Sequence, residues 1–153
     1  MPTLSDVYSK FGEAAEAAQL LETELGNLLF SAAIVEHDLK ESPNKALAKT
    51  LLEDVDRKTL GQLIRAVKQT GEAPELLEEL LVQALTERNR LNHSFFRHHN
   101  LRRNSEEGRA LMLSDLHSIH TCLLEAYKAT LLLSGIDVTN MALLRPPTSH
   151  LPI

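Results

Sequence analysis

The sequence predicts an all-α protein, and more specifically an antiparallel four-helix bundle. Tryptophan is absent and aromatic residues make up only 4% of the chain, so the core must consist mainly of leucine and alanine, which are strong helix formers. Apolar residues recur every three or four positions in three long segments, as on the buried face of a helix. Short breaks of Gly, Pro, Ser and Asn separate these segments, and short connections favour antiparallel neighbours.

The first long helix is predicted from Leu4 to about His37, because its apolar residues follow the spacing of a buried stripe. A break follows, where Ser42 or Asn44 can cap the next helix. A short, broken helix is then expected from residue 45 to about 55, continuing after a kink over 59–69. The stripe of the first helix consists of Phe11, Ala14, Ala18, Leu21, Leu25, Leu28 and Ala32.

Two further long helices are predicted in the second half of the chain. Gly71 suits a helix C-cap and Pro74 suits a first helical turn, so the third long helix should run from residue 75 to about 96. The last helix should open at Ser105 and stop at Gly135. Its broad apolar face comprises Leu113, Leu116, Ile119, Leu123, Ala126, Thr130 and Leu133.

Length and composition indicate one domain. A chain of 153 residues is about one domain long, and we expect a single helical domain over 1–136. Prolines predict an irregular C-terminal tail over 137–153. The single cysteine, Cys122, cannot form an internal disulfide, and neither a signal peptide nor an apolar run of membrane-spanning length is present. These observations favour a cytoplasmic protein without a membrane partner.

One basic segment, 88–104, stands out from an acidic chain whose net charge is −5. It contains five arginines and no acidic residue, so it could attract phosphate. The alternative is a solvated helix end whose arginines are stabilised by the C-terminal helix dipole. Charge alone leaves both interpretations open.

Arg88 lies on the apolar stripe of its helix, between Ala84 and Leu91. A guanidinium is rarely buried without a partner. It could extend past the edge of the bundle to solvent, or it could pair with a carboxylate of a neighbouring helix. It could also sit in a partly buried cleft, where its planar fork would bind an anion.

His93 follows Arg88 by five positions, which corresponds to about 140° around the axis of a regular helix. The two side chains therefore diverge within one helix. A joint site would need a bend near His93 or a second copy of the helix across a twofold axis. The second possibility predicts a homodimer.

The segment resembles the signature of HEPN domains, which are helical bundles of prokaryotic toxins, abortive-infection proteins and RNA-guided ribonucleases. The family motif is an arginine, a polar residue that is often Asn, and then a histidine after four to six intervening residues. Arg88, Asn89 and His93 match it with four. In specific sequence the resemblance covers about a dozen residues, carried by Ala84, Leu85, Arg88, Asn89, Leu91, His93, Phe95 and Phe96.

The resemblance implies a metal-independent RNA endonuclease of defence or toxin type, acting as a homodimer with a composite site and without a cofactor. Arg88 and His93 would be catalytic, Asn89 would orient them, and an antitoxin protein is a possible partner. The remaining arginines of the segment would contact RNA: Arg90, Arg97, Arg102 and Arg103. Two alternatives are a non-catalytic helical module that binds a protein or a nucleotide, and a structural dimer whose Arg88 belongs to a buried ion-pair network.

The other histidines suggest no catalytic group. His117 and His120 are three residues apart on the last helix and could share a metal, but no further ligand pattern accompanies them, so no metal site is expected. We expect His98 and His99 to contact solvent or RNA phosphate.

Overall fold

The computed structural model describes residues 1–71 and 73–135, so the predicted tail lies outside the described residues. Within them the fold is all-α, as predicted, and contains no strand. The elements are α1 (Leu4–Glu36), α2 (Lys45–Asp56), α3 (Leu60–Gln69), α4 (Glu75–His93), α5 (Phe95–His98), the 3-10 helix η1 (Arg102–Asn104) and α6 (Glu106–Leu133).

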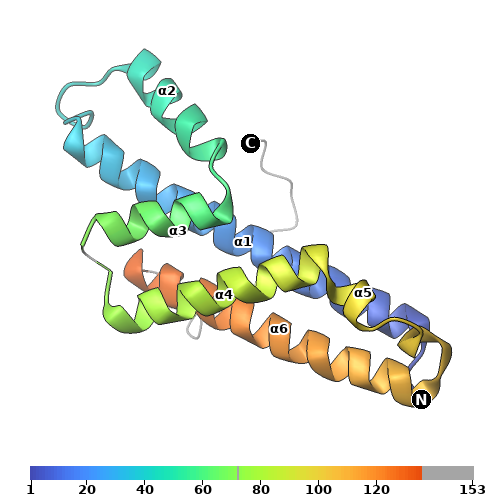
Figure 1. Cartoon of the computed structure of the whole chain (residues 1–153). Coiled ribbons are helices and arrows are strands. Elements are labelled where there is room, and N and C mark those ends of the chain that lie inside the picture. Colours follow the sequence, from blue (N-terminus) through green and yellow to red (C-terminus); the bar gives the residue numbers. More distant parts are fainter. Residues whose placement is uncertain (72, 136–153) are drawn as a thin grey trace, which may run out of the picture.

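The three long helices α1, α4 and α6 lie side by side and pack against one another (Figure 1). α1 and α6 run in the same direction. At their N-terminal ends Arg109 Nε donates a hydrogen bond to the carbonyl of Pro2 (2.7 Å), and just after the C-terminal end of α6 Ser134 Oγ donates to Glu24 in the second half of α1 (2.6 Å).

α4 runs antiparallel to both of its long neighbours. Arg88, in the second half of α4, reaches Glu22 of α1, while Phe95, just after α4, packs against Phe11 near the start of α1. The strictly antiparallel bundle expected from the sequence is therefore wrong for the α1–α6 pair.

The reason is a chain reversal at residues 57–59, where the sequence predicted only a kink. The C-terminal end of α2 returns to α1, since Val55 Cγ1 lies 3.1 Å from the position of a Cβ built on Gly26. α3 then turns back along α1 and packs across α1 and α4, with Thr59 as the N-cap of a new capping box to Gln62 (Figure 1). Two short helices thus lie between α1 and α4 in the chain. Because the chain reverses once more between these two helices, α6 runs parallel to α1.

Most predicted helix boundaries are confirmed, because their chemistry is local. Asn44 Oδ1 accepts from the amide of Leu47 (3.0 Å) at the start of α2, and Ser105 Oγ accepts from Gly108 (3.0 Å) at the start of α6. Gly71 ends its helix with φ +70°, a conformation that favours glycine.

The core is formed by α1, α3, α4, α5 and α6, whereas α2 contributes no buried residue. Among the described residues, no helix combines the length and apolarity that crossing a membrane would require. The largest side chains that are almost fully buried are Phe95, Leu21, Leu25, Leu60, Leu81, Leu91, Met112, Leu116, Ile119 and Leu123.

Candidate functional site

The Arg88 guanidinium bridges α4 and α1 by an ion pair. Nη2 donates to Glu22 Oε1 at 2.7 Å, and Nη1 donates to Asn89 Oδ1 at 3.1 Å. The Arg88 side chain is 22% exposed and that of Glu22 is 31% exposed, so solvent reaches both. Of the possibilities for Arg88, pairing with a carboxylate of a neighbouring helix is what the structure shows.

The partner of Arg88 also borders a cavity of about 230 Å³ between α1, α2 and the start of α3. Glu22, Thr23 and Gly26 line it from α1, and Lys58 lines it from the opposite side. The ion pair therefore lies at the edge of a cavity with a mixed polar and apolar lining, and not inside the apolar core.

His93 is the last residue of α4 and is exposed. Ser94 leaves the helical conformation (φ −139°, ψ −7°), so the helix ends three residues before the predicted Phe96 and restarts as α5. Because this bend follows His93, Arg88 and His93 remain on one regular helix and point in different directions. Within the described part of the chain the His93 ring makes no hydrogen bond, and the protomer does not bring it to Arg88.

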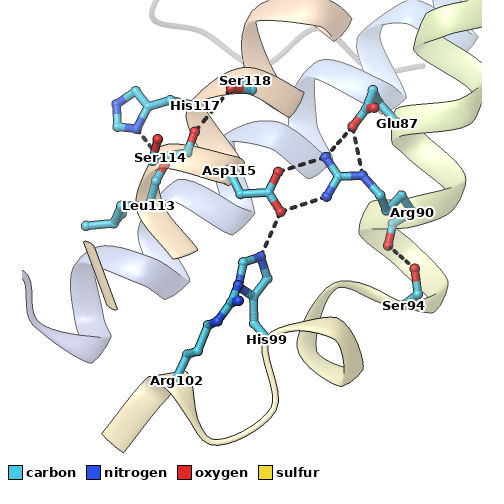
Figure 2. Close-up of polar contacts among 10 residues, drawn as sticks. All are labelled: Glu87, Arg90, Ser94, His99, Arg102, Leu113, Ser114, Asp115, His117 and Ser118. Carbon is cyan, nitrogen blue, oxygen red and sulfur yellow. Dashed lines mark hydrogen bonds and ion pairs between the residues drawn. The ribbon is translucent and has the colours of Figure 1, made fainter. Parts of the chain in front are cut away.

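Arg90 belongs to a different cluster, between α4 and α6 (Figure 2). Its guanidinium forms a bidentate pair with Asp115, with Nη1–Oδ2 and Nη2–Oδ1 distances of 2.6 and 2.8 Å. Nε and Nη2 also donate to Glu87 Oε2, at 3.1 and 2.6 Å. Two carboxylates therefore occupy this arginine, although the linear segment around it contains none.

The cluster has marked electrostatic effects on its members. Hydrogen bonds from Arg90, opposed in part by burial and aided by His99, lower the pKa of the Asp115 carboxyl from 3.8 to about 2. The hydrogen bond to Asp115, with a further contribution from Glu87, raises the pKa of Arg90. Both groups are thus held in their charged forms near neutral pH.

His99 completes the cluster and is only 3% exposed. Its Nε2 lies 2.7 Å from Asp115 Oδ2, and Arg102 Nη1 lies 3.0 Å from its Nδ1. Since a guanidinium can only donate, Nδ1 accepts and Nε2 carries the proton that is donated to Asp115. Figure 2 shows this chain of contacts from η1 to α6. The expectation that His99 contacts solvent or RNA is therefore wrong, because its ring is buried beneath the segment that follows α5.

The remaining predicted RNA-binding arginines have no carboxylate partner within residues 1–71 and 73–135. Arg97 is exposed and donates to the His93 carbonyl at 3.3 Å. Arg103 is also exposed, and only its backbone carbonyl is engaged, by Arg109 at 3.0 Å.

Sequence reasoning missed four residues that organise this region. One of them had a local signal, because Glu87 precedes Arg90 by three positions, the spacing of a helical ion pair. Glu22 and Asp115 lie on other helices far away in the sequence, and His99 was expected to contact solvent or RNA. No spacing in the sequence indicates that these three residues pair with the arginines. The four are Glu22, Glu87, His99 and Asp115.

The two histidines considered as metal ligands have separate partners. His117 Nδ1 donates to the carbonyl of Leu113 at 2.8 Å (Figure 2), and His120 Nδ1 accepts from Lys10 at 2.8 Å. Across the part of the chain that the structure describes, no group of three His, Cys, Asp or Glu side chains is arranged to hold a metal ion.

Comparisons of the chain with protein-family models, curated proteins and solved structures found no match.

Proposed function

We propose that this protein is a metal-independent RNA endonuclease of defence or toxin type, with an HEPN-like four-helix arrangement. Its active form is a homodimer, in which Arg88 of one subunit meets His93 of the other. An antitoxin protein that covers this site would be its natural partner.

The observation that carries the proposal is the state of His93. Its ring is exposed and without a hydrogen-bond partner in the described chain, at the end of a helix whose adjacent turn is anchored in the core by Phe95. An imidazole held in this way can reach a bound substrate and donate or accept a hydrogen bond there. Arg88 is fixed by Glu22 and Asn89, about 140° away around the helix, so one subunit alone cannot complete the site.

The residue types suit cleavage by internal phosphate transfer. The ribose 2′-oxygen attacks the adjacent phosphorus, the bond from phosphorus to the 5′-oxygen breaks, and the product ends in a 2′,3′-cyclic phosphate. His93 would transfer a proton at the attacking or the leaving oxygen. The Arg88 fork would stabilise the charge that develops on the phosphate oxygens.

Complementation between two inactive variants tests the composite site. Arg88→Ala and His93→Ala should each lose cleavage of total RNA, with chelator present throughout. Mixed after unfolding and refolding together, they should recover roughly a quarter of wild-type activity, since half of the dimers are mixed and each holds one intact site.

Three results would contradict this proposal in different ways. If the mixture of Arg88→Ala and His93→Ala recovers no RNA cleavage although mass spectrometry shows mixed dimers, the shared site is contradicted. Cleavage that survives His93→Ala or requires added metal would overturn the mechanism.

The third result, no cleavage of any RNA by the wild type, would favour a non-catalytic module that binds a protein or a nucleotide. The Arg88–Glu22 ion pair favours instead a non-catalytic structural dimer, because an arginine with a purely structural role would be paired in the same way.

A further inference from the structure

Four of the six aromatic residues of the chain gather at one end of the molecule, where α5 packs on the first turns of α1. Phe11 and Phe95 lie toward the core. Tyr8 and Phe96 remain 47% and 43% exposed, with their ring centroids 6.2 Å apart. We call these two exposed rings the aromatic platform.

The platform is held from beneath. Phe95 is buried, and its ring lies 4.6 Å from that of His99, which is anchored to Asp115. Phe96 packs against Phe11 at 5.1 Å and edge-on against Phe95 at 5.2 Å. A ring supported in this way can accept another flat group on its exposed side without losing side-chain freedom, which lowers the entropy cost of binding.

The surroundings of the platform are suited to an anion. Arg97 follows Phe96 directly, and neither Arg97 nor Arg103 has a carboxylate partner in the described residues. The third arginine at this end, Arg102, donates to a neutral imidazole and keeps its charge unpaired. The carboxylates within five residues of these side chains in the sequence are Asp6, which accepts hydrogen bonds from Thr3, Glu13, which pairs with Lys10, and Glu106 and Glu107 in the first turn of α6.

We propose that the aromatic platform of Tyr8 and Phe96 stacks an unpaired RNA base, while Arg97 and Arg103 bind the flanking phosphates. This inference rests on the proposed function and names its substrate class, single-stranded RNA. Exposed aromatic rings beside arginines bind single strands because every base offers a flat face, whereas the bases of a duplex are already stacked inside it. Only two residues separate Phe96 from His93, so a stacked nucleotide would lie next to the proposed catalytic histidine.

The chain has no tryptophan, so Phe96→Trp provides a unique fluorescent reporter. It is combined with His93→Ala to prevent cleavage and titrated with a short oligouridylate. The emission should be quenched saturably by the single strand and not by a duplex of the same length. Leu76→Trp, at a 68% exposed position at the other end of α4, is the matched control and should show no quenching.

Affinity measurements on substituted platforms complete the test. In the His93→Ala background, Phe96→Leu and Tyr8→Leu should each weaken binding of the single strand by about tenfold, as expected for the loss of one stacked base. Leucine at position 96 keeps apolar contact with Phe11, and circular dichroism establishes that each variant is folded. The use of two positions keeps the test valid if one variant misfolds.

Several outcomes would overturn the inference. These are no quenching, equal quenching by duplex, or unchanged affinity in both leucine variants. A change in emission with protein concentration alone, accompanied by dimer in light scattering, would show that a second copy covers the rings.

Failure of the platform and failure of the proposed function are distinguishable. RNA cleavage with an unchanged KM in both leucine variants would refute the platform while the ribonuclease stands. Stacking without any cleavage by the wild type would refute the ribonuclease while the platform stands.

Discussion

Arg88 and Arg90 lie two positions apart in the sequence and have different environments. Arg88 faces α1 and forms one ion pair at the edge of a cavity, whereas Arg90 faces α6 and makes four hydrogen bonds to two carboxylates. The sequence indicated that Arg88 on the apolar stripe needed a partner. It did not indicate Glu22, because a helical period gives the face of one helix and not the residue opposite it.

This contrast predicts different costs for removing the two arginines. Arg88→Ala should lower the free energy of unfolding by less than about 1 kcal/mol, because Glu22 is accessible to water. Arg90→Ala should cost about 1 to 3 kcal/mol, because it leaves Asp115 and Glu87 without their shared donor. Urea unfolding of both variants provides the measurement. If both variants lose the same free energy of unfolding, a loss of RNA cleavage in Arg88→Ala could come from destabilisation and would not identify Arg88 as a catalytic residue.

The low pKa of Asp115 predicts a stability that depends on pH. The carboxyl has a pKa of about 2 in the folded protein against an ordinary 3.8, so its stabilisation is complete above about pH 4 and is lost as the pH falls toward 2. With screening by solvent, this contribution is about 1 to 2 kcal/mol.

The comparison of wild type with Asp115→Asn isolates this contribution. The variant should be less stable than wild type at pH 7, and the difference should shrink as the pH approaches 2. Unfolding curves at a series of pH values measure it. A difference that stays constant down to pH 2 would refute the assignment.

At the scale of elements, the segment from α5 to α6 is a tightly packed connection. Leu101 adopts a left-handed conformation (φ +62°), and η1 passes directly over the first turn of α6. The sequence predicted the cap at Ser105 but not this crossing, nor the reversal between α2 and α3. Caps depend on residues within one turn, whereas the path of a connection depends on what it packs against.

The close crossing makes Gly108 sensitive to substitution. A Cβ at this position would clash with the Arg102 carbonyl and lie 2.7 Å from its Cα, so Gly108→Ala must displace η1 and should destabilise by about 1 to 3 kcal/mol. Gly12→Ala is the matched control, because nothing lies within 4 Å of its added Cβ. At that exposed helical position alanine should stabilise by about 0.5 to 1 kcal/mol. The midpoint of thermal unfolding should therefore fall for Gly108→Ala and rise for Gly12→Ala. Equal shifts in the two variants would contradict the close crossing of η1 over α6.

At the scale of the whole molecule, α1, α4 and α6 share one core, while α2 stands outside it. The sequence predicted the all-α class and the three long helices because their apolar stripes are periodic. It also predicted helix over 45–55 without indicating that none of its side chains is fully buried. α2 has an apolar side, including Leu52 and Val55, but these side chains are only partly covered by α1.

The peripheral position of α2 has a consequence for proteolysis. An enzyme that cuts after lysine and arginine requires an extended backbone, and the cost of local unfolding is lowest where no side chain is buried. Trypsin should therefore cut first within or beside α2, after Lys45, Lys49, Arg57 or Lys58. The segment 97–104, which offers three arginines, should resist, because Phe95, His99 and the contact at Gly108 hold it to the core. Mass spectrometry of the early fragments identifies the first cut. In native size-exclusion chromatography the cut protein should elute at the volume of the uncut protein, because packing among α1, α4 and α6 holds the two pieces together.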